Sequence, residues 1–173
     1  MKGIIPACLH ELVRTKFGKD KWADILKDAG FPPFTLFLAS EVIEDTDIFK
    51  LLQSTCKVLN LTLEETADAF GDFWINSFAI DIYKPFYLES KSAKEFLLNM
   101  NNLHDNLTKI MPDACPPKFT YSWKNKKTLI MTYSSKRGLI DIMVGLTKGV
   151  GTYFKENLKV IKLGNDKVKI IFE

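Results

Sequence analysis

The chain contains two histidines, His10 and His104, and their surroundings differ. His104 lies four residues after Met100 and three before Leu107, so a helix would place it beside an apolar stripe. A buried neutral imidazole there is either satisfied by a carbonyl, as a core residue, or used as a metal ligand. His10 lies on a short amphipathic helix with no acidic or histidine cluster near it, and we interpret it as structural.

A second polar group occupies Tyr133–Arg137, which reads Tyr-Ser-Ser-Lys-Arg. In an extended chain successive side chains alternate between faces, so Tyr133, Ser135 and Arg137 should emerge together. Two hydroxyls and a guanidinium suit an acidic ligand with several oxygens, because arginine donates charge-assisted hydrogen bonds. Together with His104, this row could hold the iron and the propionates of one haem. An exposed polar strand end is the alternative interpretation of the row.

At these residues the sequence resembles the H-NOX family, the haem-based nitric oxide and oxygen sensing domains related to the sensory domain of soluble guanylate cyclase. The resemblance covers essentially the whole chain. It rests on Met1-Lys2-Gly3-Ile4-Ile5, Asn102-Leu103-His104, Pro117 and Tyr133-Ser134-Ser135-Lys136-Arg137. It implies that His104 is the proximal ligand of the iron of haem b. It further implies that Tyr133, Ser135 and Arg137 bind the haem propionates and that Pro117 presses on the macrocycle.

The resemblance also implies which apolar side chains surround the haem, namely Ile5, Leu9, Trp74, Phe78, Ile142 and Leu146. Ordinary core packing is the alternative for each of them. Oxygen-binding members are expected to carry a tyrosine five residues after the motif arginine, where this chain has Ile142. Bound oxygen gains from a hydrogen-bond donor that nitric oxide does not need, so the sequence predicts a nitric oxide sensor. Trp74 carries an indole N–H and keeps an oxygen-binding domain as the alternative.

The expected role is that of a gas sensor that acts on another protein. Family members of this length are commonly partners of histidine kinases or cyclic-dinucleotide enzymes, so we expect such a partner in trans. In this hypothesis nitric oxide binding weakens or breaks the bond to His104 and alters a partner-binding surface. Carbon monoxide is expected as a further gas ligand. A haem enzyme such as a peroxidase needs a distal histidine or arginine, which the sequence does not place there. We therefore expect no catalytic site, with a haem-free interaction domain as the remaining alternative.

Composition excludes several other classes. The chain has 173 residues, of which 46% are hydrophobic and 26% charged, enough for one compact core. Its net charge of +3 is spread over all segments, which argues against nucleic-acid binding. No apolar run approaches the roughly 20 residues of a membrane span, and we expect a cytoplasmic protein. Three separated cysteines predict neither a disulfide framework nor a structural zinc site.

The elements that must position these residues predict an α+β fold, with helices first and a sheet later. Apolar residues at helical spacing predict helices over 5–13, 22–29, 47–59, 63–78, 92–111 (ending near Pro112) and 139–155. Thr62 and Glu65 form a capping-box pattern before the fourth of these helices. Two hairpins are predicted over 118–133 and 158–172. We expect one haem-binding domain over 1–173, with the haem buried between a helical part, 1–60, and a helix-plus-sheet part, 61–173.

Overall fold

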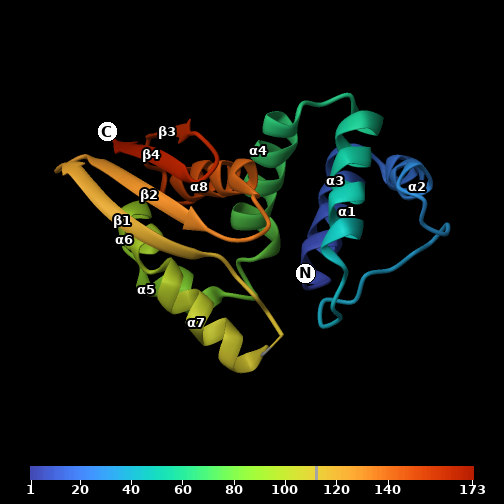
Figure 1. Ribbon diagram of the computed structural model, residues 1–173, viewed down its shortest axis with the longest axis horizontal. Helices are drawn as coiled ribbons and strands as arrows, with labels where there is room; N and C mark the ends of the chain where they lie inside the picture. The colour runs from blue at the N-terminus through green and yellow to red at the C-terminus, as the bar shows by residue number, and fades with distance from the viewer. Residues whose placement is uncertain (112) are drawn as a thin grey trace. The chain divides into compact units, whose positions relative to one another are not determined.

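The computed structural model describes residues 1–111 and 113–173 (Figure 1). These residues form two compact units, 1–66 and 67–173, and the division falls within helix α4 (Leu63–Phe73). The sequence placed its boundary between residues 60 and 61, in the loop before this helix. Within the two described ranges, no helix combines the length and the apolar character that a membrane span requires.

The N-terminal unit is helical, as the sequence predicts. Helix α1 (Ile4–Lys16) packs on α2 (Lys19–Asp28), and α2 packs on α3 (Asp45–Leu59). Leu12, Val13, Ile25, Leu26 and Leu51 are buried in this unit. The capping box at the start of α4 is confirmed: the Glu65 N–H donates to Thr62 Oγ1 at 3.2 Å, and the Thr62 N–H donates to the Glu65 carboxylate at 2.8 Å.

The C-terminal unit is built on an antiparallel sheet. Within residues 113–173 the strands β1 (Lys118–Asn125), β2 (Thr128–Ser134), β3 (Leu158–Leu163) and β4 (Lys167–Phe172) form a four-stranded sheet in the order β1-β2-β4-β3. Both predicted hairpins are confirmed. The alternating residues Leu129, Met131, Val168 and Ile170 belong to the buried core, because one face of the sheet is covered by helices.

Those covering elements are the π-helix η1 (Trp74–Phe78), α5 (Lys84–Glu89), α6 (Ala93–Leu98), α7 (Met100–Ile110) and α8 (Ile140–Phe154). They contribute Ile75, Tyr87, Phe96, Leu103 and Met143 to the same core as the sheet residues. Figure 1 shows α5, α6 and α7 following one another along the β1–β2 hairpin. The α+β fold class predicted from the sequence is therefore confirmed, with this sheet and its helices in one unit.

Three helical predictions need correction. The predicted helix over 63–78 is α-helical only to Phe73 and continues as a π-helix, with the Ala79 N–H donating to the Trp74 carbonyl at 2.9 Å. The predicted helix over 92–111 is interrupted at Asn99, whose N–H is shared between the carbonyls of Glu95 and Phe96. Asparagine favours such tightened turns because its side chain competes with the helical backbone. Helix α5 was not predicted, and the predicted end near Pro112 lies outside the described residues.

Helices α4 and α8 approach so closely that a side chain at Gly71, Gly145 or Gly149 would meet main-chain atoms of the other helix. A Cβ added at Gly145 would lie 2.0 Å from the carbonyl oxygen of Ala67, and one added at Gly71 would lie 2.1 Å from the carbonyl carbon of Gly145. The opposing atoms belong to the main chain and cannot rotate away. Lys148 and Asp68 form an ion pair of 2.6 Å between the same two helices. The glycines at these positions have no side chain and therefore allow α4 and α8 to lie this close together.

We expect Gly145→Ala to lower the free energy of unfolding by about 2 kcal/mol. Overfilling a packed contact costs about 1–3 kcal/mol, with the upper end expected against main-chain atoms, and the better helix propensity of alanine offsets about 1 kcal/mol. Urea unfolding of the haem-free protein measures this change. The control Thr152→Ala, at an exposed position of the same helix, should stay within about 0.5 kcal/mol of wild type. Equal stability of the Gly145 variant would show that the contact is not tight.

Candidate functional site

His104 is held in one orientation by the main chain. Helix α7 carries it on its partly buried side, and its Nδ1 lies 2.9 Å from the carbonyl oxygen of Pro117, in the loop before β1. Because a carbonyl oxygen only accepts, Nδ1 must carry the hydrogen and donate it. Nε2 is then the unprotonated nitrogen, and it has no hydrogen-bond partner among the described residues. Metal-binding histidines in proteins are oriented in this way.

The protonation state of His104 also suits a ligand. Burial lowers the pKa of the imidazole below its usual value, and the hydrogen bond to Pro117 and the carboxylate of Asp105 only partly oppose this effect. The ring is therefore neutral at pH 7, the form that binds metals. His10, by contrast, stacks on Trp22 with ring centroids 5.0 Å apart.

Asn101 joins helix α7 to strand β1, and sequence reasoning did not find it. Its Nδ2–H donates to the Phe119 carbonyl at 2.7 Å, and its Oδ1 accepts from the Phe119 N–H at 2.9 Å. Strand β1 is an edge of the sheet, so the asparagine amide takes the place of a neighbouring strand. Asn101 lies one turn before His104 and thereby fixes the helix relative to Pro117. An amide on the predicted apolar side of a helix was the signal available in the sequence.

A second bond holds the preceding helix to the same strand. The Tyr121 hydroxyl donates to the carbonyl of Leu97, at the end of α6, at 2.9 Å. Burial raises the pKa of Tyr121 to about 12, so this hydroxyl remains a donor at every physiological pH. Helix α7, which carries the histidine, and helix α6, which precedes it, are thus both tied to β1 by hydrogen bonds between a side chain and the main chain.

We expect Asn101→Ala to destabilise the haem-free protein by about 2 kcal/mol, because two hydrogen bonds are lost and the partly buried N–H and carbonyl of Phe119 lose their partner. Chemical unfolding measures the change. The neighbouring Asn102→Ala, at an exposed position of the same helix, serves as the matched control and should change stability by less than about 0.5 kcal/mol. If both variants matched wild type, α7 would not depend on the amide.

A groove borders this histidine. Its volume is about 410 Å³, and it is lined by Asn101, His104, Asp105, Thr108, Ala114, Cys115, Pro116, Pro117 and Lys118. This volume falls in the range of small-molecule sites. The groove therefore reaches the α7–β1 junction where His104 meets the loop carrying Pro117.

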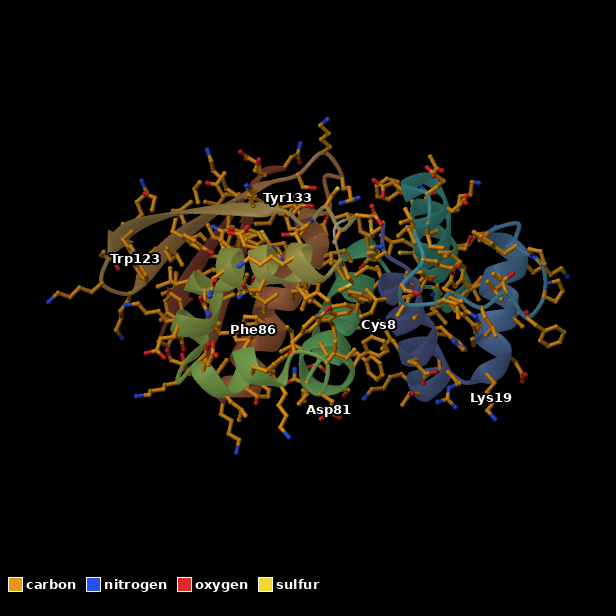
Figure 2. The ribbon with its side chains drawn as sticks, turned by 90° about the horizontal axis from the view of Figure 1, so that it is seen from below. Cys8, Lys19, Asp81, Phe86, Trp123 and Tyr133 are labelled. Atoms are coloured by element: carbon orange, nitrogen blue, oxygen red, sulfur yellow. The ribbon has the colours of Figure 1, made fainter. Side chains whose placement is uncertain are left out.

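The structure places the Tyr-Ser-Ser-Lys-Arg motif partly as predicted. Tyr133 lies near the end of β2, and Figure 2 shows it at the opposite end of the β1–β2 hairpin from Trp123. The predicted strand alternation fails beyond Ser134, where β2 ends and a turn begins. In that turn the Arg137 N–H donates to Ser135 Oγ at 3.2 Å. A turn, and not a strand face, therefore sets the positions of Ser135 and Arg137.

Tyr133 and Ser135 of this motif retain hydroxyl donors that an anionic ligand could use. The Tyr133 hydroxyl oxygen accepts from the Leu139 N–H at 3.3 Å, which leaves its own hydrogen without an acceptor among the described residues. The Ser135 hydroxyl hydrogen is likewise available. The Arg137 Nη1–H donates to the Cys115 carbonyl at 2.5 Å, so the guanidinium reaches the loop that leads to Pro117. Phe119 lies between the two parts of the site, 5.7 Å from the His104 ring and 6.2 Å from the Tyr133 ring.

The apolar candidates lie on three elements. Trp74 and Phe78 are half-buried on η1 with ring centroids 5.8 Å apart, and Trp74 also stacks on Phe70. Ile142 and Leu146 are half-buried one turn apart on α8, and α8 packs on η1. Ile5 and Leu9 lie on α1 of the N-terminal unit. The structure thus brings Trp74, Phe78, Ile142 and Leu146 onto two packed elements.

Metal ligation by a cluster of side chains finds no support in the described part of the chain. No group of three or more His, Cys, Asp or Glu residues there is arranged to hold an ion. A single imidazole nitrogen and a row of anion-binding donors instead fit a metal that brings its own macrocycle and carboxylates, which is the chemistry of haem.

Solved structures with this fold are haem proteins of one class. An H-NOX protein from S. oneidensis in the Fe(II)NO ligation state matches with a TM-score of 0.86 and 20% identity, covering 100% of this chain and 98% of that chain. An oxygen-binding H-NOX domain related to soluble guanylate cyclases, in its oxygen complex, matches with a TM-score of 0.81 and 26% identity, covering 100% and 95%. The fold is therefore the H-NOX fold.

Sequence comparison gives the family. The profile of the haem-NO-binding family, HNOB, matches residues 2–162. Soluble guanylate cyclase gcy-34 from Caenorhabditis elegans is 29% identical over 155 residues, which are 87% of this chain and 22% of the cyclase. The chain thus spans less than a quarter of the length of that relative. It belongs to the haem-NO-binding family and is an H-NOX domain, a haem-binding gas sensor domain related to the sensory domain of soluble guanylate cyclase.

Proposed function

We propose that this domain senses nitric oxide through a haem b whose iron is ligated by Nε2 of His104. Tyr133, Ser135 and Arg137 bind the propionates, and the ring of Pro117 contacts the macrocycle. When bound, the haem supplies a ferrous iron to which a diatomic gas coordinates. The single observation that carries this proposal is the Nδ1 to Pro117 carbonyl hydrogen bond, which leaves a neutral imidazole whose Nε2 has no partner in the described ranges 1–111 and 113–173.

The experiment that tests the ligand is replacement of His104 by glycine. We expect purified wild-type protein to show a Soret absorption band, His104→Gly to lose it, and added imidazole to restore it, because free imidazole can occupy the position that the side chain left. His10→Gly is the matched control and should keep the band. A variant without His104 that keeps its haem spectrum unchanged would refute this ligation.

The proposed propionate site predicts which of two substitutions, at Arg137 or at Ser135, lowers haem retention more. Arg137→Ala should lower the haem-to-protein ratio of the purified protein more than Ser135→Ala, because charge-assisted hydrogen bonds to a carboxylate are roughly twice as strong as neutral ones. Ser134→Ala, at an exposed strand end, is the control. Equal haem retention in the Arg137 and Ser135 variants would contradict the assignment of the guanidinium to a carboxylate.

The preference for nitric oxide rests on the side chains that we propose to surround the gas. Ile5, Leu9, Phe78, Ile142 and Leu146 have no hydrogen-bond donor. Bound oxygen carries partial negative charge, and a hydrogen bond to it contributes about 1.5–3 kcal/mol, or roughly one to two powers of ten in affinity. Without that donor the pocket favours nitric oxide over oxygen. It also suits carbon monoxide, a neutral gas that can serve as a probe.

We therefore expect the ferrous protein to bind nitric oxide and to form no stable oxygen complex in air. Absorption spectra of the ferrous protein under argon, air and nitric oxide measure this directly. Ile142→Tyr supplies a donor and should raise oxygen affinity, while Ile142→Phe, of similar size and without the hydroxyl, should not. A stable oxygen complex of the wild type in air would refute the preference.

Oxygen binding is the second candidate, and one observation favours it. Trp74 on η1 carries an indole N–H that makes no hydrogen bond among the described residues, and a solved relative at 26% identity is an oxygen complex. In that case Trp74→Phe would abolish the oxygen complex.

The output that we propose is regulation of another protein. By the family resemblance this partner is a histidine kinase or a cyclic-dinucleotide enzyme that meets the domain in the cytoplasm. The domain itself acts as a regulatory module without a catalytic site. Gas binding would signal by moving α7, because this helix carries the ligand His104 and is held to the loop before β1 by the His104 to Pro117 hydrogen bond.

A further inference from the structure

The π-helix η1 disturbs the hydrogen-bond ladder that it continues. In an α-helix each N–H donates to the carbonyl four residues earlier, whereas in a π turn the acceptor moves back by one residue. The Ala79 N–H accordingly donates to the Trp74 carbonyl. Carbonyls near such a turn can also accept from side chains. At the residue after Trp74, the Tyr87 hydroxyl donates to the Ile75 carbonyl at 3.0 Å.

Just before the π turn, the side chain of Asn76 bonds to Asp72. Its Nδ2 lies 3.1 Å from the carbonyl oxygen of Asp72 and 3.0 Å from the Asp72 carboxylate. Asp72 is the penultimate residue of α4, so this amide bridges the junction between the α-helix and the π turn. The Asn76 amide therefore joins the π turn to the last turn of α4.

The same amide also bonds to helix α8. Asn76 Nδ2 lies 3.1 Å from the carbonyl oxygen of Gly149, more than seventy residues away in the sequence. Gly149 lies against main-chain atoms of α4, because a Cβ there would be 2.6 Å from the Gly71 carbonyl oxygen. Asn76 thus connects the π turn to the point where α4 and α8 touch. No apolar side chain of similar size can donate to these acceptors.

The two elements that Asn76 connects carry the residues proposed to surround the gas. Trp74 and Phe78 belong to η1, and Ile142 and Leu146 belong to α8. We propose that Asn76 is a positioning residue of the gas pocket: by bonding to Asp72 and Gly149, it fixes the spacing between the aromatic pair on η1 and the aliphatic pair on α8. This inference rests on the proposed function, since it assigns those four residues to the gas side.

The alternative is that Asn76 only stabilises its helix. A measurement that responds to the gas pocket distinguishes this structural role from the positioning role. The vibration of carbon monoxide in the ferrous complex responds to the side chains around it and not to the global stability of the fold. We expect Asn76→Ala and the nearly isosteric Asn76→Asp, which loses the donors, to broaden or shift the C–O stretching band. Carbon monoxide dissociation should also become faster, by roughly fivefold if the loosened pocket holds the gas less tightly by about 1 kcal/mol.

Two further measurements complete the test. Ser77→Ala, an exposed neighbour in the same π turn, is the matched control and should keep the wild-type band and rate. In haem-free protein, hydrogen exchange at the Ala79 amide should accelerate roughly tenfold in Asn76→Ala, while the Met131 amide in the sheet core keeps its rate.

The outcomes are distinguishable. Faster Ala79 exchange with an unchanged C–O band and dissociation rate would make Asn76 a structural residue and overturn its positioning role alone. If neither the hydrogen exchange of the Ala79 amide nor the C–O stretching band changed, the hydrogen bonds of Asn76 would not hold the π turn at all. A wild type that takes up no haem would overturn both this inference and the proposed function.

Discussion

The arrangement of the site depends on one hydrogen bond, from Nδ1 of His104 to the carbonyl of Pro117. It decides which nitrogen carries the hydrogen, keeps the ring from rotating, and directs Nε2 away from the main chain. The bond joins a helix to the loop before an edge strand, so it can exist only while α7 stays on β1. Asn101 and Tyr121 provide that attachment through three hydrogen bonds to or from β1. The sheet in turn buries Phe119 and Tyr133, and the Phe119 ring lies between those of His104 and Tyr133, the first residue of the motif proposed to bind the propionates.

The two sides of the proposed haem site are held together by different interactions, namely hydrogen bonds on the histidine side and helix packing on the gas side. On the histidine side, polar side chains bind main-chain groups, and the donors of Tyr133, Ser135 and Arg137 are those that suit carboxylates. On the gas side, packed helices hold apolar residues at a distance set by Gly71, Gly145 and Gly149. In the proposed pocket most side chains are apolar, which fits a neutral ligand such as nitric oxide, and the close contact between α4 and α8 fixes the spacing of these helices. Ligation and gas selection are therefore proposed for separate elements of the fold.

Much of this fold follows from local sequence patterns. Alternation of apolar and polar residues predicts both hairpins, and the Thr62 and Glu65 spacing predicts the capping box, because these signals depend on neighbours in the chain. The π turn at 74–78 and the interruption at Asn99 could not be predicted, since the apolar stripe continues through both. The extended alternation expected through Ser135 and Arg137 was likewise wrong, because β2 ends at Ser134 and a turn follows.

Among the site residues, the place of His104 beside an apolar stripe allowed both a core residue and a metal ligand, and the family resemblance favoured the ligand. Asn101 was visible only as an amide on the apolar side of a helix, and nothing in the sequence marked Asn76. Their importance lies in hydrogen bonds to Phe119 and Gly149, which are distant in the sequence. Such contacts are fixed by tertiary packing, and an asparagine within a helical pattern carries no mark of its partner.

The most direct test of the central claim is the iron–histidine stretching vibration of the ferrous protein, measured by resonance Raman spectroscopy with ¹⁵N-labelled histidine. The chain has two histidines, so a His10→Gln background leaves His104 as the labelled residue. The account predicts an iron–nitrogen band that shifts to lower frequency on labelling. A haem-loaded protein whose spectrum does not change on labelling would contradict it.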